Sequence, residues 1–336
     1  MRKAVSLVLM VGTLLMSGLP VAHADDRIGA AACRALFWLH TQQCSDGSFG
    51  FRGSNGSCTP SASVTADAVY ALALIGEDPA GAAWTVGGKS ALDALAKLAP
   101  SYVYADAGQA GKVARAVALA GGNPQNFGEL NLNLIATINA AYNPTTGRYH
   151  PDYLYRHTLA VEALLRSHET VPDAALNALM TAQLTDGGWF WSFTGTQSDV
   201  DTTGRVMQLL AGVAGEVAPD AYDRAASYLE HAQASDGGWN TGYVSGPPNG
   251  NSTALAVGSL WAAGFDPQAP RFVKNGHGAV DTLLTFQEPS GAFVYIRQPG
   301  QEEVRLMATL DVLTALASQL NGASVCRVIY LPLVLR

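Results

Sequence analysis

Charged residues are scarce in this chain: only 14% of its 336 residues are Asp, Glu, Lys or Arg. The formal net charge is −7, so the chain offers no basic footprint for nucleic acid. Runs of β-branched residues are few, while alanine and leucine dominate, which favours an all-α protein. After the first 24 residues, no apolar run reaches the roughly 18 residues that a membrane-spanning helix needs. We therefore expect neither a nucleic-acid partner nor a transmembrane segment.

An apolar run does occur at the start of the chain. Arg2 and Lys3 precede the apolar residues 4–15, and small residues at 22–24 follow them. This pattern is typical of a secretory signal peptide. We expect residues 1–24 to be removed and the protein to be secreted, and loss of the two cations takes the formal charge from −7 to −9.

Cysteine is also scarce, with four residues in the chain. An even number in an exported protein suggests disulfide bonds. Cys44 and Cys58 flank a loop rich in glycine and serine, and a bridge between them contributes roughly 3 kcal/mol on the chain-entropy model. Cys33 and Cys326 would then join the first helix to the tail, provided that the fold closes on itself. The sequence leaves the other pairings of these cysteines open.

A short motif recurs along the chain, consisting of Gln, three residues, Gly, one residue and an aromatic residue. Its good copies begin at Gln43, Gln183, Gln233 and Gln287 and end at Phe49, Trp189, Trp239 and Phe293. A degraded copy keeps Asn143, Gly147 and Tyr149, and a further one survives only as Leu98, Tyr102 and Tyr104. The copies are 40 to 55 residues apart. A repeat of this length indicates stacked or closed helical units.

Each repeat predicts two helices, the first ending near the Gln and the second starting after a glycine-rich connection. The second helices are apolar nearly all round, which is typical of buried helices. The first helices carry more charge, so we predict an outer ring of first helices around an inner ring of second helices. The predicted pairs are 28–42 with 63–75, 90–98 with 108–119, 130–141 with 153–167, 173–183 with 199–213, 220–233 with 252–263, and 278–287 with 302–320.

The good motif copies resemble the prenyltransferase and squalene-oxidase repeats of terpenoid cyclases and protein prenyltransferase β subunits. The resemblance covers residues 27–320 and implies an α6/α6 toroid, a double ring of six helical hairpins. It also implies that the Gln and aromatic side chains tie neighbouring helices together. We expect a signal peptide at 1–24, a toroid domain at 25–320 and an apolar tail at 321–336. The tail would pack as an extended strand or serve in export or anchoring.

One stretch points to chemistry. Residues 199–203, Asp-Val-Asp-Thr-Thr, are similar to the Asp-x-Asp-Asp-Thr motif of squalene–hopene-type cyclases, in which the middle carboxyl, here Asp201, protonates an alkene. Such an acid needs an undissociated carboxyl in a dry pocket. However, Thr202 replaces the last Asp, and those cyclases pair two helical domains where this chain has one. Helix capping by Asp199, with Asp201 as a first-turn carboxylate, explains the same residues structurally.

Metal and cofactor chemistry is not indicated. The zinc-dependent prenyltransferases require an Asp, a Cys two residues on and a distant His, but no cysteine lies between Cys58 and Cys326. The histidines lack tight metal-ligand spacing, and no Cys-Gly-Glu-Gln thioester motif occurs. Cobalamin carriers of this fold use a second β domain, for which the roughly 15 residues after the last helix are too few. We expect no metal and no cofactor.

We expect the N-termini of the inner helices to meet at one funnel-shaped mouth. Aromatic and charged side chains in a concavity suit a sugar or an amphipathic molecule. The candidate ligand-binding residues there are Asp199, Thr202, Arg156, His157, Tyr155, Trp191, Glu303 and Arg305.

Two functional hypotheses follow from these features. The first is an exported, non-catalytic toroid that binds a small apolar molecule, a saccharide or a protein partner at the mouth. The second is an enzyme with Asp201 as its general acid: a terpene-cyclase-like isomerase or lyase, or a carbohydrate-active enzyme in which Asp201 and Glu303 act as a pair. A deep, dry cavity would favour an isoprenoid, a shallow and carboxylate-lined one a sugar, and a nearly filled one a scaffold.

Overall fold

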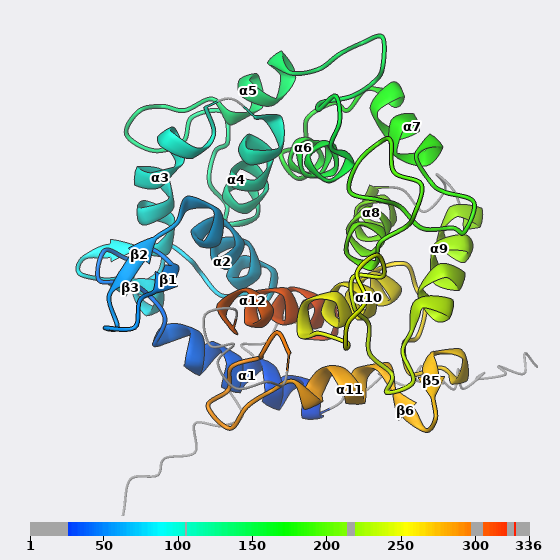
Figure 1. Ribbon diagram of the computed structural model, residues 1–336. Coiled ribbons are helices and arrows are strands. Elements are labelled where there is room, and N and C mark those ends of the chain that lie inside the picture. Colours follow the sequence, from blue (N-terminus) through cyan, green and yellow to red (C-terminus); the bar gives the residue numbers. More distant parts are fainter. Residues whose placement is uncertain (1–25, 105, 214–218, 297–304, 321–325, 327–336) are drawn as a thin grey trace, which may run out of the picture.

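The helices of this protein form two concentric rings (Figure 1) in a computed structural model that describes residues 26–104, 106–213, 219–296, 305–320 and 326. The inner ring consists of α2 (Ala62–Leu74), α4 (Ala107–Leu119), α6 (Leu154–Arg166), α8 (Val200–Val213), α10 (Gly250–Ala262) and α12 (Arg305–Leu316). The outer ring consists of α1 (Asp26–His40), α3 (Ala91–Tyr102), α5 (Leu134–Ala140), α7 (Asp173–Thr181), α9 (Pro219–Ala232) and α11 (Ala279–Thr285). The predicted α6/α6 toroid is confirmed. The expected signal peptide, Glu303 and the tail apart from Cys326 lie outside the described residues.

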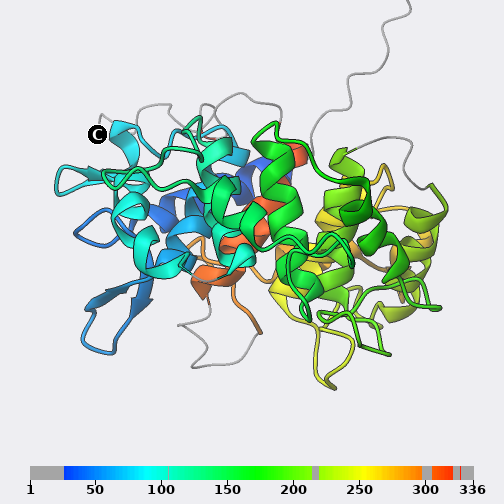
Figure 2. The same ribbon diagram turned by 90° about the horizontal axis from the view of Figure 1, so that it is seen from above.

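Most helix ends lie within a few residues of their predicted positions, and α3 is an exception. It continues past residue 98 to Tyr102, so the residual motif copy there forms no turn, and Tyr104 is 89% exposed. Short antiparallel hairpins join some of the helices. They are β1 (Gly50–Arg52) with β2 (Cys58–Pro60), β3 (Thr85–Val86) with β4 (Lys89–Ser90), and β5 (Val273–Lys274) with β6 (His277–Gly278). Seen from the side, the β1–β2 hairpin extends from the lower edge of the ring (Figure 2).

Neighbouring inner helices run parallel to one another, and glycine lets α4 and α6 approach closely. A Cβ atom at Gly108 would lie 2.5 Å from Arg156 Cβ, and one at Gly111 would lie 2.6 Å from the carbonyl oxygen of Leu159. Both pairs advance by three residues along both helices, so the two helices share one direction. Glycine is therefore needed for space at these positions, and its helix-propensity cost is offset by closer packing.

The motif glutamines connect each unit to the next one. Each Nε2 donates to the carbonyl of the motif glycine and to a second carbonyl further along the ring. The second acceptors are Trp84 for Gln43 (2.8 Å), Ala221 for Gln183 (2.9 Å), Phe272 for Gln233 (2.8 Å) and Ala31 for Gln287 (2.8 Å). The motif aromatics are fully buried, and the indole N–H groups of Trp189 and Trp239 donate to backbone carbonyls of the preceding outer helices.

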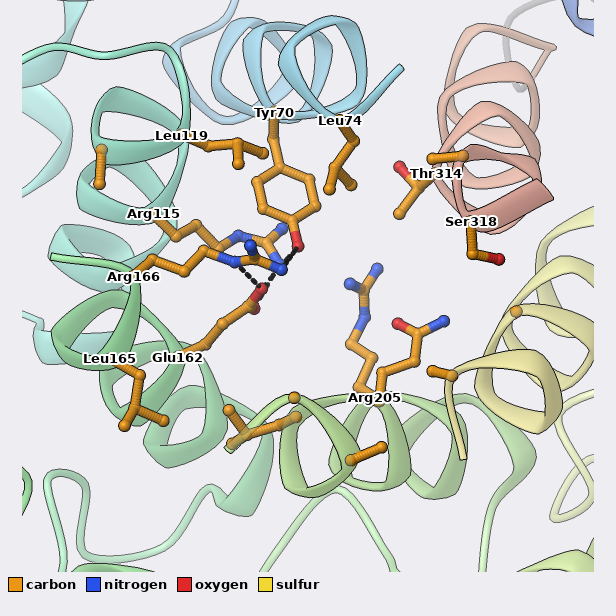
Figure 3. Close-up of a pocket in the computed structure, with 18 of the residues that line it drawn as sticks. Tyr70, Leu74, Arg115, Leu119, Glu162, Leu165, Arg166, Arg205, Thr314 and Ser318 are labelled. Carbon is orange, nitrogen blue, oxygen red and sulfur yellow. Dashed lines mark hydrogen bonds and ion pairs between the residues drawn. The ribbon is translucent and has the colours of Figure 1, made fainter. Parts of the chain in front are cut away.

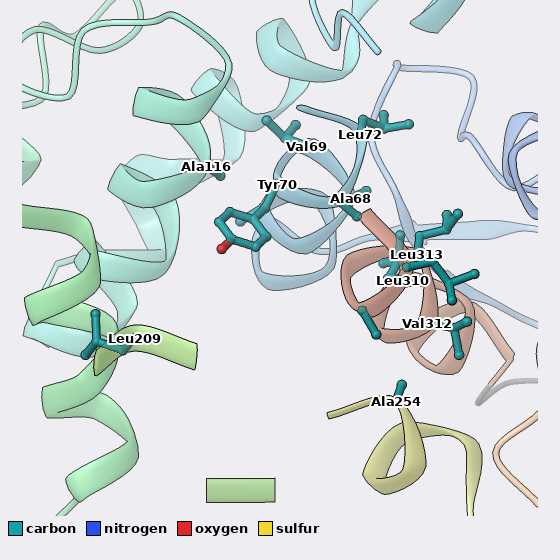
Figure 4. Close-up of a cluster of buried hydrophobic side chains, with 14 of the residues drawn as sticks. Ala68, Val69, Tyr70, Leu72, Ala116, Leu209, Ala254, Leu310, Val312 and Leu313 are labelled. Atoms are coloured by element: carbon teal, nitrogen blue, oxygen red, sulfur yellow. The ribbon is translucent and has the colours of Figure 1, made fainter. Parts of the chain in front are cut away.

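The ring closes where the last unit meets the first. Gln287 of the last unit donates to Ala31 of α1, and α12 packs against α2, where Ala68 lies beside Leu310 and Leu313 (Figure 4). Both expected disulfides are present. The Cα atoms are 5.2 Å apart in Cys33–Cys326 and 5.7 Å apart in Cys44–Cys58, distances usual for disulfides. None of the helices described has the length and apolar character needed to cross a bilayer.

Candidate functional site in the centre of the ring

A cavity of about 700 Å³ occupies the centre of the inner ring (Figure 3). Every inner helix lines it, with residues between the middle of the helix and its C-terminal end. For example, α2 contributes Tyr70 and Leu74, and α4 contributes Arg115 and Leu119. The cavity therefore lies among the C-terminal halves of the inner helices, at the end opposite to the mouth that the sequence suggested.

A polar cluster at the inner end of the cavity is centred on Glu162 of α6. Its Oε1 accepts hydrogen bonds from the Tyr70 hydroxyl (2.6 Å) and from Arg166 Nε (2.9 Å), and its Oε2 accepts one from Arg115 Nη1 (2.8 Å). Burial alone would raise the pKa of Glu162, but the Arg115 and Arg166 charges, together with these hydrogen bonds, lower it to about 2. Glu162 therefore stays ionised at any physiological pH.

A second layer of charged groups lies behind the cavity, toward the N-terminal ends of the helices. Arg205, which lines the cavity, pairs with Asp311 at 3.3 Å. Asp67 pairs with Lys112 at 2.6 Å and with Arg115 at 3.4 Å. Burial raises the pKa of Asp311, and the Arg205 charge opposes this shift. Asp67, Lys112 and Asp311 do not themselves line the cavity.

Apolar side chains form much of the remaining wall. Leu74, Leu119, Leu165 and Leu209 come from four different inner helices, and alanine and glycine fill the spaces between them. The arrangement is polar at the inner end and apolar along the sides. In the part of the chain that the structure describes, no group of three or more His, Cys, Asp or Glu residues is placed to hold a metal ion.

The acidic motif at the start of α8 lies outside this cavity. Asp199 is 2% exposed and caps the helix, its Oδ1 accepting the Thr202 N–H at 2.6 Å. Burial raises the pKa of Asp199 to about 6. Burial also raises the pKa of Asp201, against the effects of the Ser252 hydroxyl and the Arg205 charge. Asp201 does not line the cavity, whereas Arg205, one helical turn further along α8, does.

Three of the expected ligand-binding residues meet near the N-terminus of α6. The Tyr155 N–H donates to the Trp191 carbonyl at 3.3 Å, and Trp191 is 40% exposed on its loop. Arg156 pairs with Asp106, the N-cap of α4, and lies over the Tyr153 ring at 5.1 Å. Arg156, Tyr153 and Trp191 form a partly exposed aromatic and charged group, whereas the Tyr155 ring lies 5.4 Å from the Arg205 guanidinium. None of these residues except Arg205 lines the central cavity.

His157 and Arg305 occupy separate positions. His157 is fully buried: its Nδ1 accepts the Tyr149 N–H at 3.1 Å, and its Nε2 lies 3.0 Å from the Ala175 carbonyl. Both ring nitrogens are therefore engaged by the backbone. Arg305 pairs with Glu288 at 2.8 Å. The expected set is thus distributed over the starts of three inner helices.

The residues of the cavity's inner end did not emerge from sequence reasoning, although a signal for them exists. The ninth residue of four inner helices is polar, although the neighbouring residues in each helix are mostly apolar. They are Tyr70 in α2, Arg115 in α4, Glu162 in α6 and Gln208 in α8. In parallel helices of similar length, residues at the same position in each helix lie at the same height along the ring axis. The four polar residues therefore indicate a shared polar layer.

The geometry of this double ring is found in other proteins of known structure. The sequence itself matches no protein-family model and no curated protein. The fold is similar to that of the type II terpene cyclase MstE from Scytonema, with a TM-score of 0.63 and 14% identity over 89% of this chain and 100% of that chain. A protein from Actinoplanes gives 0.61 and 17% over 88% and 99%, and a glycosidase variant gives 0.58 and 12% over 88% and 97%.

The class to which this structure is assigned is the terpenoid-cyclase-like α6/α6 toroid. At these identities the likeness concerns the fold alone. Because a terpene cyclase and a glycosidase share it, the chemistry must be argued from the residues of this chain.

Proposed function

We propose that this protein is an exported, non-catalytic toroid that binds a small, largely apolar molecule in its central cavity. The cavity itself is the observation that carries this proposal. It measures about 700 Å³, has leucine side chains from four inner helices and gathers its arginines and Glu162 in one cluster. Concave, mostly apolar sites with a few convergent polar groups are typical of small-molecule binding. The ligand is thereby placed among the C-terminal halves of the inner helices, away from the N-terminal mouth.

The ionisation states at the inner end support a binding role rather than catalysis. General acid–base catalysis works best when the catalytic pKa is near the operating pH. The pKa of Glu162 is about 2, and its carboxylate already accepts three hydrogen bonds. Burial and the neighbouring Glu162 charge raise the pKa of Tyr70, so its hydroxyl keeps its proton. Neither group is poised to exchange a proton with a ligand at neutral pH.

Similar proteins provide a chemical analogy for the ligand. A variant of the cyclase MstE holds geranylgeranyl dihydroxybenzoate, a molecule with a long apolar chain. The leucine-rich sides of the present cavity are compatible with an apolar chain of this kind. Export is supported by the pattern of residues 1–24 and by two disulfides, which persist in oxidising compartments.

Filling the cavity should abolish binding. Leu165→Trp places an indole ring in the wall, whereas Leu130→Trp adds the same ring at a loop position that is 70% exposed. We expect the affinity for the apolar dye Nile red, measured by fluorescence titration, to fall about tenfold or more in Leu165→Trp, since overpacking typically costs 1–3 kcal/mol. Leu130→Trp should bind as the wild type does. Equal affinities in the two variants would place the dye elsewhere and defeat the proposal.

A cyclase-like enzyme is the second candidate, and the raised pKa of Asp201 is the observation in its favour. An acid that protonates an alkene must be undissociated, which burial promotes. Incubation with squalene or with geranylgeranyl substrates, followed by mass spectrometry of the products, distinguishes the two candidates. Cyclised product that disappears in Asp201→Asn would overturn the non-catalytic assignment.

A further inference from the structure

We infer that the ligand of the central cavity is an amphipathic acid, whose oxyanion head, a carboxylate or a phosphate, is held by Arg205 and Arg166. This inference rests on the proposed function of the cavity as a ligand site, and it adds the charge and the orientation of the ligand. The head occupies the inner end, and the apolar body lies between the leucines toward the C-terminal ends of the helices. Figure 3 shows the Arg166 guanidinium beside Glu162 and Tyr70 and the Arg205 guanidinium on the neighbouring helix α8, both directed toward the open space.

The charges that face the cavity are unbalanced. Its lining includes three arginines, Arg115, Arg166 and Arg205, but among the described residues only one carboxylate, Glu162. The carboxylates that compensate the other arginines, Asp67 and Asp311, lie behind the lining (3.4 and 3.3 Å from their partners). The side chains that line the cavity therefore carry an excess of positive charge.

Hydrogen-bond donors are also in excess at the inner end. A guanidinium has five N–H donors. Among the described residues, Arg205 makes one hydrogen bond, to Asp311, and Arg166 uses only its Nε and Nη2 groups, toward Glu162 and Tyr70. The Gln208 side chain also lines the cavity and makes no hydrogen bond within the described part of the chain. The Glu162 carboxylate, by contrast, already accepts three hydrogen bonds.

An oxyanion fits this surplus better than a neutral polar group does. A carboxylate or phosphate brings several acceptor lone pairs and matches the planar fork of a guanidinium. The Coulombic attraction between a guanidinium and an anion is stronger at the low effective dielectric constant of a partly buried site than in water. A neutral hydroxyl gains only an ordinary hydrogen bond.

The helix dipoles act in the opposite direction, but they are weaker. The parallel inner helices direct their C-termini, each with a partial negative charge, toward the outer end of the cavity. The effect of each dipole is screened by water and fades within one helical turn. Arg205 lies about two turns before the end of α8 (Val200–Val213), and Arg115 lies about one turn before the end of α4 (Ala107–Leu119). The head therefore binds at the inner end and not at the rim.

The depth of the cavity suggests the size of the apolar body. From Arg205 to Gly212 the lining follows α8 for seven residues, which corresponds to roughly 10 Å at 1.5 Å per residue. Leu74, Leu119 and Leu165 surround this path on the other helices. A saturated chain of about ten carbons is a suitable probe for a path of this length.

The test compares ligands that differ only in the head. Decanoate, decyl phosphate, decanol and decyltrimethylammonium are titrated against Nile red bound to the wild-type protein. We expect decanoate or decyl phosphate, or both, to displace the dye at about 10- to 100-fold lower concentration than decanol, as charge-assisted hydrogen bonds predict. Arg205→Met should remove this preference, and Arg205→Lys should retain most of it. The matched control Lys97→Met removes one positive charge from the exposed face of α3 and should leave the preference intact.

Arg166→Met provides an independent variant, in case loss of Arg205 leaves Asp311 unpaired and prevents folding. Equal displacement by decanoate, decyl phosphate and decanol would overturn the inference but leave the cavity as a ligand site. A preference that survives in both Arg205→Met and Arg166→Met, or a preference for the ammonium head, would also overturn it. Failure of Nile red to bind the cavity at all would instead defeat the proposed function. Comparison of decanoate with decyl phosphate identifies the head.

Discussion

One side-chain hydrogen bond recurs near the start of the inner helices. In each good repeat, a threonine hydroxyl accepts the backbone N–H of the motif aromatic. The pairs are Phe49 with Thr65 (3.0 Å), Trp189 with Thr203 (2.9 Å), Trp239 with Thr253 (3.0 Å) and Phe293 with Thr309 (2.8 Å). In the degraded third repeat, His157 takes over this role toward Tyr149. His157 therefore acts as a variant of the structural threonine.

His157 should make the protein sensitive to mild acid. Burial lowers the pKa of His157 to about 4, whereas the unfolded chain titrates near 6.5. Between these values only the unfolded chain binds the proton, so stability is lost as the pH falls from 6.5 to 4, by roughly 3 kcal/mol over the window. Urea unfolding at pH 7, 5.5 and 4.5 should show a smaller acid-induced loss in His157→Gln, which cannot titrate there. Identical pH dependence in both proteins would contradict this account.

The acidic motif illustrates what residue types alone can and cannot predict. Capping by Asp199 could be foreseen because an Asp before a helix accepts an N–H three residues on. Whether Asp201 faces a cavity could not be foreseen, because that depends on the side chains that the five other inner helices contribute at the same level. Arg205, one turn after Asp201, lines the cavity and Asp201 does not.

At the scale of helices, the closest approach in the inner ring depends on glycine. A Cβ atom at Gly111 would lie 2.6 Å from a backbone oxygen of α6, which cannot move aside independently. We expect Gly111→Ala to lower the free energy of unfolding by roughly 1–3 kcal/mol through overpacking. Gly29→Ala in α1, where nothing lies within 4 Å, should raise it by up to about 1 kcal/mol through helix propensity. Thermal and urea unfolding of both variants provide the measurement, and destabilisation of equal size in the two would refute the packing argument.

The helices could be predicted from sequence more readily than the site. Apolar periodicity and the motif spacing determine where each hairpin begins and which helix is inner, because both follow from local patterns. The end of the first helix in the second repeat was mispredicted, because the motif there has decayed and α3 continues through Pro100 to Tyr102. The residues that line the central cavity were not foreseen, because single polar residues such as Arg115 and Glu162 stand out only when several helices are aligned by position.

At the scale of the whole molecule, stability depends on the contact between the first and last units. There Gln287 bonds Ala31 and Arg34, and Arg27 pairs with Asp281 at 2.7 Å. The Cys33–Cys326 bridge reinforces the same region. This boundary differs from the others in that no peptide connection spans it.

Replacement of Gln287 should therefore have a different effect from replacement of the same residue inside the chain. Gln287→Ala and Gln183→Ala each remove two backbone hydrogen bonds and should cost roughly 1–3 kcal/mol. Only Gln287→Ala should also speed amide hydrogen exchange in α1, because local opening there is limited by side-chain contacts. Hydrogen exchange read by mass spectrometry tests this. Unchanged protection of α1 in Gln287→Ala, or equal loss in Gln183→Ala, would speak against it.

The contact between the first and last units also has a consequence for circular permutation of the chain. Since α12 and α1 are neighbours in space as much as α2 and α3 are in sequence, the architecture has no inherent first hairpin. A circularly permuted gene, with the old ends joined by a linker and a new start at another hairpin, would still encode every core contact. In this protein, the arrangement of the hairpins in the ring does not depend on which hairpin comes first in the sequence, so the position of the chain start can change during evolution.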